Sequence, residues 1–243
     1  MAIMDQLLET VTEDAPMREL RVGPRCVALW SRGLGLAYHF RPGPDDTPPP
    51  RAALPPKMRD ATTLEITRWA RSQDPLCAAV GVAAVNALLR PPAHLLQQGD
   101  AYQLIASQGS GKEVTVVGHF PFVDRLRAEV RRLNVLELNP QPGDLPASQA
   151  PEVIPRSDVV AITGATLVNH TMDQLLRLAA GRFVVVVGPT SVLSPVLFDH
   201  GVSAICGAQV TDAVEVLRAL GEGENLRHNR GIRKVLWTAG GRR

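Results

Sequence analysis

The hydrophobic pattern of the chain changes character near residue 112. Beyond that point, apolar runs without polar alternation recur, and stretches with apolar residues three and four positions apart separate them. Such runs are typical of strands that are buried on both faces of a parallel sheet, with helices between them. Strands are expected at residues 113–118, 133–138, 158–164, 183–188 and 203–206, with a further strand at 231–237. The pattern predicts an α/β fold whose residues 112–243 form a Rossmann-like ligand-binding domain with a parallel sheet.

The pattern before residue 112 predicts a smaller α+β domain over residues 1–108. Two apolar segments, 26–30 and 34–40, flank the turn-forming Ser31-Arg32-Gly33 and predict a β-hairpin. Helices are expected near residues 3–11, 62–71, 75–89 and 100–107; Thr62 and Glu65 supply a capping box for the second of them. Residues 41–56 contain seven prolines, which predicts an exposed Pro-rich loop.

Composition and charge exclude several classes of protein. The net charge is +2 and aromatic residues make up 4% of the chain, so neither a basic surface nor a stacking platform for nucleic acid is indicated. The three cysteines lie far apart with no C-x-x-C pair, which argues against a disulfide framework and favours a reducing, cytoplasmic location. No apolar run reaches the roughly 18 residues that a membrane span needs, and no basic signal-peptide region opens the chain.

Candidate chemistry lies where the predicted parallel strands end, because ligands of open parallel sheets bind outside the carboxyl ends of the strands. Gly118 and His119 follow the first strand; glycine lets the backbone approach a ligand, and histidine binds metals or transfers protons. Glu137 ends the second strand, 19 residues after Gly118, where dinucleotide folds place an acidic residue on a ribose. The glycine-rich phosphate loop of those folds is missing, so an ordinary NAD site is not expected, and a solvated glutamate is the alternative. Asp144 could act beside Glu137 or simply build its turn.

The third and fourth strand ends carry most of the polar residues. Hydroxyl groups, an amide and a glycine converge over residues 163–171 at an expected helix start, which suits a carboxylate or a phosphate. The alternative is that Thr171 or Asn169 only caps the expected helix, but capping accounts for one polar residue of this stretch and not for the others. A similar polar loop spans residues 188–191. The expected ligand-binding residues are Gly118, Thr163, Gly164, Thr166, Asn169, Thr171, Gly188, Pro189, Thr190 and Ser191.

Three motifs resemble a known family. V-V-G-H-F-P at 116–121, D-V-V-A-I-T-G-A-T-L-V-N-H-T at 158–171 and V-G-P-T-S-V-L-S-P-V-L-F-D-H-G-V at 187–202 resemble the bacterial and archaeal heavy-metal chelation family. Residues 1–108 resemble its companion domain, which is enolase-N-terminal-like, most clearly in A-A-V-N-A-L-L at 83–89. The resemblance implies a cleft between the two domains, with the strand-end loops on one side and Asn86 on the other. The third strand of the companion domain would fall where the prolines lie.

Three functions follow as hypotheses. In the first, the chain binds or processes a small anionic ligand or a metal chelate, with a transition metal held by His119 and His170. In the second, it is a lyase or a nucleotide- or methyl-donor-dependent transferase, with His119 as acid or base and Glu137 on a ribose. In the third, it is a non-catalytic partner protein that uses the Pro-rich loop and the basic C-terminal residues as contact surfaces. A homodimer is compatible with all three, since the helix near 75–89 is rich in small residues.

Overall fold

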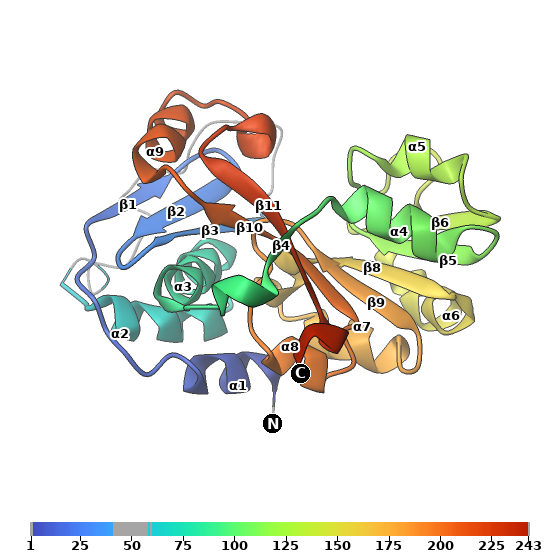
Figure 1. Ribbon diagram of the computed structural model, residues 1–243, viewed down its shortest axis with the longest axis horizontal. Coiled ribbons are helices and arrows are strands. Elements are labelled where there is room, and N and C mark those ends of the chain that lie inside the picture. The colour runs from blue at the N-terminus through green and yellow to red at the C-terminus, as the bar shows by residue number, and fades with distance from the viewer. Residues whose placement is uncertain (1, 41–57, 59, 243) are drawn as a thin grey trace.

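The computed structural model describes residues 2–40, 58 and 60–242, so the predicted Pro-rich loop at 41–56 lies outside the described residues. The described chain forms two sheets (Figure 1). A three-stranded antiparallel sheet has the order β1-β2-β3, and an eight-stranded sheet has the order β4-β11-β10-β9-β8-β5-β6-β7. The predicted α/β class with a Rossmann-like parallel sheet is confirmed.

Six strands of the large sheet are parallel and two are antiparallel to their neighbours. The parallel strands are β5 (Glu113–Val117), β6 (Arg132–Glu137), β7 (Leu145–Pro146), β8 (Val159–Thr163), β9 (Phe183–Val187) and β10 (Ala204–Val210). The antiparallel strands are β11 (Ile232–Thr238), as expected at 231–237, and the two-residue β4 (Gln97–Gln98). From β5 the chain runs outward through β6 to β7 and then returns to the other side of β5 as β8. The direction of winding therefore reverses between β5 and β8, and this reversal is where such folds bind ligands.

Helices cover both faces of the large sheet, which is why its central strands are almost wholly apolar. On one face, α4 (Ala101–Gly109) contacts β8 and β9 and shares a core with α5 (Val123–Arg127). The other face packs on α6 (Ala150–Val153), α7 (Met172–Leu178) and α8 (Val196–Asp199). One expectation needs correction. The helix expected at 100–107 was assigned to the first domain, but Ile105 is fully buried on the large sheet. Between β5 and β6, α5 ends at Arg127, and Val130 pairs with Ser110 in an isolated bridge.

The small sheet confirms the predicted hairpin and supplies its third strand from a different place. Strands β2 (Cys26–Trp30) and β3 (Leu34–Tyr38) pair across the turn, and β1 (Glu19–Val22) pairs with β2. The third strand of the described sheet thus precedes the hairpin, and the place after the hairpin where the resemblance implied a strand lies outside the described residues. On one face lie α2 (Thr63–Thr67), which has the predicted capping box, and α3 (Pro75–Leu88), which Asp74 caps. Gly35 on β3 lets the sheet approach α3 closely, since a Cβ at this position would lie 2.0 Å from the Ala83 carbonyl oxygen.

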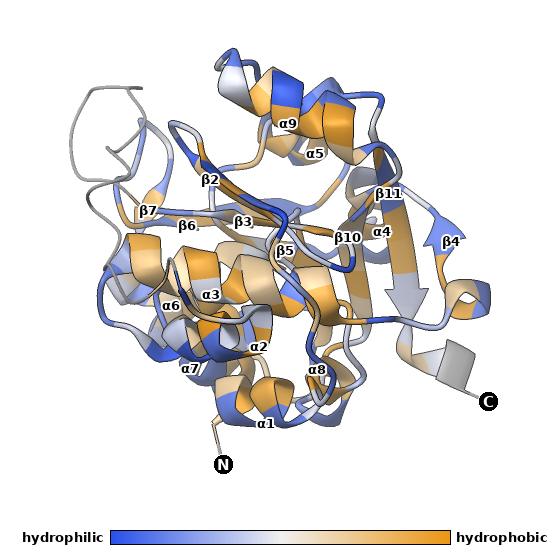
Figure 2. Cartoon of the chain, turned by 90° about the vertical axis from the view of Figure 1, so that its left-hand side faces the viewer, coloured by the Kyte–Doolittle hydropathy of each residue, from blue (hydrophilic) through white to orange (hydrophobic). Residues whose placement is uncertain are grey.

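The two parts of the chain are packed together by elements from both halves. The C-terminal α9 (Ala213–Gly221) covers the face of the small sheet opposite α3, as Figure 2 shows, and buries Leu217 and Leu220 against it. The N-terminal α1 (Ile3–Glu9) contacts α8 below the large sheet (Figure 1). Each half therefore contributes a helix to the packing of the other. Among the described residues, no helix has the length and apolar character needed to cross a membrane.

Candidate functional site

The site is built where the winding of the large sheet reverses. Gly118 follows β5 with a φ of 102°, in the left-handed region that favours glycine. A Cβ placed on Gly118 would lie 3.2 Å from Cβ of Thr163, which ends β8. The backbone after β5 therefore touches the end of β8, as the sequence predicted from the polar strand ends.

The loop after β8 packs in turn on the loop after β9. A Cβ on Gly164 would lie 2.4 Å from the backbone nitrogen of Ser191 and 2.7 Å from its Oγ. These are contacts that only a residue without a side chain allows. The three glycine- and hydroxyl-bearing segments that begin near residues 118, 163 and 188 thus lie side by side at one edge of the sheet.

Most of the predicted ligand-binding hydroxyls hold these loops together. Thr166 Oγ1 donates a hydrogen bond of 2.7 Å to the carbonyl oxygen of Thr163. Thr190 Oγ1 accepts a bond of 2.9 Å from the amide of Tyr38, at the end of β3, and so ties the small sheet to the large one. A side-chain cap of α7 by Thr171 was one expectation. Thr171 does not form this cap, because its hydroxyl donates at 2.7 Å to Asn169 Oδ1. The hydroxyls of the three threonines and the amide of Asn169 are thus engaged in hydrogen bonds within the chain.

Ser191 and Gly188 differ from their neighbours. The Ser191 Oγ is buried, and it has no hydrogen-bond partner in the described part of the chain. A Cβ on Gly188 would meet no atom within 4 Å, so space adjoins the turn after β9. Pro189 lies between these two residues and, lacking an N–H, donates no backbone hydrogen bond. A buried hydroxyl without a partner is costly unless something outside the chain satisfies it.

His119 is held by a buried carboxylate. Its Nδ1 lies 2.9 Å from Asp144 Oδ2 and 3.2 Å from Oδ1. The Asp144 side chain is 2% exposed and that of His119 is 27% exposed. An ionised carboxylate only accepts hydrogen bonds, so Nδ1 carries the proton and, in the neutral ring, Nε2 keeps a lone pair. The pair therefore fixes one imidazole nitrogen as a metal ligand or a base.

Glu137 positions the backbone of His119. Its Oε1 accepts a bond of 2.6 Å from the His119 amide, and its Oε2 accepts one of 2.9 Å from the amide of Leu138. Both carboxylate oxygens are thus engaged by the chain itself. The structure brings together His119, Glu137 and Asp144, of which sequence reasoning had selected the first two and treated the third mainly as a turn residue. Asp144 also stabilises its turn, since its Oδ2 accepts a hydrogen bond of 3.1 Å from the Gln141 amide.

Apolar side chains directly follow His119 and Glu137 along the chain. Phe120 stacks on Phe122, with the ring centres 5.1 Å apart and the planes 5° from parallel. Leu138 is 56% exposed, which is unusual for a large apolar side chain. Carbon surface therefore follows both His119 and Glu137 in the sequence.

Asn86 and His170 lie in other surroundings. Asn86 Nδ2 donates at 3.0 Å to the carbonyl oxygen of Leu36, so it fastens α3 to β3. His170 has a φ of 60°, and its Nε2 lies 2.7 Å from the carbonyl oxygen of Ser72. The two histidines expected as metal ligands are thus held by different partners. Within residues 2–40, 58 and 60–242, no three histidine, cysteine, aspartate or glutamate side chains are grouped so as to hold a metal ion.

Comparisons with known proteins give a consistent match. Residues 100–237 match the family model DUF364 and residues 4–89 match DUF4213, both described as "Putative heavy-metal chelation". A crystal structure of a DUF364 protein of unknown function from Desulfitobacterium hafniense superposes with a TM-score of 0.83 at 28% identity, covering 97% of this chain and 96% of that one. A DUF364 protein of unknown function from Pyrococcus horikoshii gives a TM-score of 0.80 at 20% identity, with 98% of each chain covered, which shows likeness of fold. An uncharacterized protein of Methanocaldococcus jannaschii is 30% identical over 161 residues, which span 63% of this chain and 62% of that protein.

Proposed function

From the premise that this chain belongs to the heavy-metal chelation family DUF364, we propose that it binds a transition-metal chelate at the edge where β5, β8 and β9 end. His119 Nε2 would take one coordination position of the metal. The observation that carries the proposal is the clamping of His119 Nδ1 by the buried Asp144. Metal-binding histidines ordinarily donate their second ring nitrogen to a carboxylate in this way, which fixes the tautomer and raises the basicity of the ligand nitrogen.

The remaining groups suit a chelate better than a bare ion. A single imidazole supplies one ligand, and a metal that arrives with its own chelator brings the others. Imidazole nitrogen suits zinc, copper, nickel and iron. The carbon surface of Phe120 and Leu138 would contact the organic part of the chelator, and the Ser191 hydroxyl would donate to one of its anionic groups.

A thermal-shift and calorimetry series tests this proposal. The probes are Co²⁺, Ni²⁺, Cu²⁺ and Zn²⁺, each alone and as the nitrilotriacetate complex, with metal-free nitrilotriacetate as the blank. A ligand present at 100 times its Kd stabilises the folded state by about 2.7 kcal/mol, which corresponds to a rise in Tm of roughly 5–10 °C for a chain of this size. The His119→Ala variant should lose this rise, and His94→Ala, which alters an exposed histidine of a 3-10 turn, should keep it. Equal binding by wild-type protein and His119→Ala would remove the metal role of His119.

The same histidine–aspartate pair supports a second function. With Nδ1 fixed by Asp144, Nε2 can act as a general base or acid on a small metabolite, and we keep a lyase or a nucleotide- or methyl-donor-dependent transferase as the alternative. Glu137 would then bind a ribose while still accepting from the His119 amide. Turnover that persists in a strong metal chelator, follows a pH profile and is lost in His119→Ala would favour this alternative.

Cellular location and assembly belong to the proposal as well. The three cysteines, Cys26, Cys77 and Cys206, are buried free thiols, which fits a reducing cytoplasm. We also keep the homodimer as a prediction. Light scattering of the purified full chain measures it directly, and a single species of monomer mass would contradict it.

A further inference from the structure

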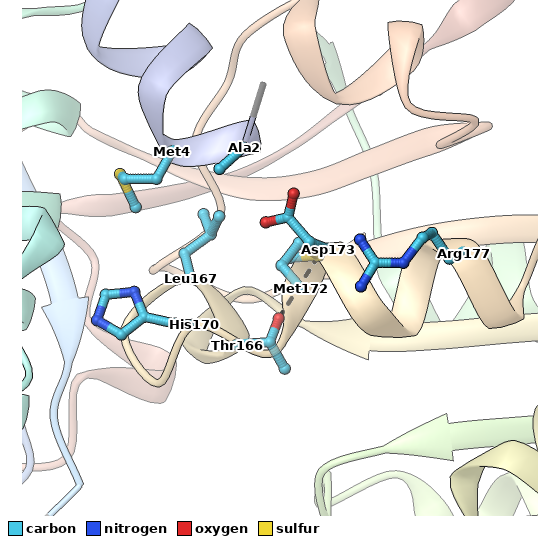
Figure 3. A pocket seen from close by; sticks show the side chains of 8 residues that line it. All are labelled: Ala2, Met4, Thr166, Leu167, His170, Met172, Asp173 and Arg177. Atoms are coloured by element: carbon cyan, nitrogen blue, oxygen red, sulfur yellow. Dashed lines mark hydrogen bonds between the residues drawn. The ribbon is translucent and has the colours of Figure 1, made fainter.

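A separate cavity lies between α1 and α7, and the proposed function does not use it. Its volume is about 520 Å³, within the range of small-ligand pockets. Figure 3 shows the side chains around it, which come from α1, from α7 and from the segment that joins β8 to α7. They are Ala2, Met4, Thr166, Leu167, His170, Met172, Asp173 and Arg177.

Two opposite charges face this cavity without neutralising each other. Asp173 and Arg177 lie one turn apart on α7, a spacing at which such side chains commonly pair. Asp173 instead turns towards α1, where its Oδ1 accepts a bond of 3.1 Å from the Ile3 amide. Within the described chain, the exposed Arg177 makes no side-chain hydrogen bond or ion pair, and Asp173 Oδ2 has no partner. A cation and an anion are therefore both available, side by side, to one ligand.

The cavity is also lined by apolar side chains. Met4, Leu167 and Met172 are each less than a tenth exposed, and the two methionines come from different helices. Thioether side chains are polarisable and adapt to guests of varied shape. These apolar side chains suit a hydrocarbon or thioether group of modest size.

His170 closes one end of the cavity in a defined orientation. The left-handed backbone is uncommon for a residue with a side chain, and here the bond from the ring to Ser72 accompanies it. A carbonyl oxygen only accepts, so His170 Nε2 carries the proton and Nδ1 of the neutral ring is left as an acceptor.

We propose that the cavity binds a small zwitterion, namely an α-amino acid with an apolar or thioether side chain. Its carboxylate pairs with Arg177. Its ammonium group donates to Asp173 Oδ2, and its side chain lies against Met4, Leu167 and Met172. This assignment does not depend on the metal-chelate proposal, because it uses neither His119 nor Asp144.

Calorimetry on the full chain with matched ligands tests the assignment. L-leucine and L-methionine should bind, whereas L-leucinamide lacks the carboxylate and 4-methylpentanoate lacks the ammonium group. Each truncated ligand should bind at least about tenfold more weakly, because it leaves one charged partner of the cavity unpaired. Failure of both amino acids to bind at millimolar concentration would overturn the proposal, as would equal affinity for leucine and leucinamide.

Variants separate the two charges. Arg177→Gln should weaken leucine binding at least about tenfold and leave the weak binding of leucinamide unchanged, since that ligand has no carboxylate to lose. The matched control is Arg131→Gln, an exposed arginine at the opposite end of the strands, which should leave leucine binding unchanged. Asp173→Asn keeps an acceptor for the Ile3 amide and should weaken leucine but not 4-methylpentanoate. Wild-type leucine affinity in both Arg177→Gln and Asp173→Asn would refute the site, and wild-type affinity in His119→Ala is the expected sign that it is separate from the sheet edge.

Discussion

Asp144→Asn isolates the contribution of the carboxylate that holds His119. The substitution keeps the size of the side chain and an oxygen that can accept from His119 Nδ1, but it removes the negative charge. It also introduces an amide that can donate to Nδ1 and so favour the opposite tautomer, in which Nε2 carries the proton. If the metal binds at Nε2, the loss of charge and the change of tautomer both weaken metal binding.

The expected loss of chelate affinity follows from two independent considerations. A hydrogen bond to a charged group contributes about 1.5–3 kcal/mol, and burial of Asp144, with a side chain only 2% exposed, shields the bond from water. Loss of the carboxylate partner of a metal-bound histidine typically costs about 10–100-fold in affinity. Since about 1.4 kcal/mol corresponds to a tenfold change in Kd, the free energy of the hydrogen bond and the loss of metal affinity agree. We expect the Kd for the metal–nitrilotriacetate complex to rise about 10–100-fold in Asp144→Asn.

The assay is calorimetric titration of wild-type protein, Asp144→Asn, His119→Ala and the double variant. Asp144 is expected to act through His119, so Asp144→Asn should have no further effect once His119 is alanine. Asp124→Asn, an exposed aspartate in the first turn of α5, is the matched control. A lower Tm with unchanged chelate affinity in Asp144→Asn would show that the pair is structural only and would refute this reasoning.

Two further predictions concern packing and ionisation. In Gly164→Ala the new Cβ meets the backbone of Ser191, so we expect the free energy of unfolding by urea to fall by about 1–3 kcal/mol and chelate binding to weaken. In the control Gly240→Ala the new Cβ meets no atom within 4 Å, so neither stability nor chelate binding should change. Wild-type stability in Gly164→Ala would contradict the close approach of Gly164 to Ser191. Burial raises the pKa of the three thiols from 9.0 to about 12, so between these values the unfolded chain releases protons that the folded chain retains, and stability falls as pH rises. Each thiol should contribute about 1.4 kcal/mol per pH unit in that window, and urea titrations should show a shallower slope for Cys206→Ala than for wild-type protein. An identical slope in the two proteins would contradict the raised pKa of the Cys206 thiol.

The sequence predicted the features that depend on local spacing. Apolar runs such as 183–188 indicated strands buried on both faces, because only a parallel sheet covered by helices hides every side chain of a run. The capping box of Thr62 and Glu65 marked a helix start, since both of its hydrogen bonds close within four residues. That the three polar strand ends lie together could be predicted as well, because carboxyl ends of parallel strands meet at one edge of a sheet whatever the loops do; the candidate site at that edge stays a prediction.

The tertiary structure decided which side chains meet. Periodicity carries no information about the path of a loop, so the contact between His119 and Asp144, 25 residues apart, could not be predicted from either residue. The engagement of Glu137 by the His119 amide and the pairing of β1 with the hairpin arose in the same way. The cavity between α1 and α7 depends on an even longer separation, 170 residues between Ile3 and Asp173. The sequence alone determined the elements and the edge where chemistry gathers, whereas long-range packing determined the partners, because a side chain's neighbours are set by how the elements stack and not by their order along the chain.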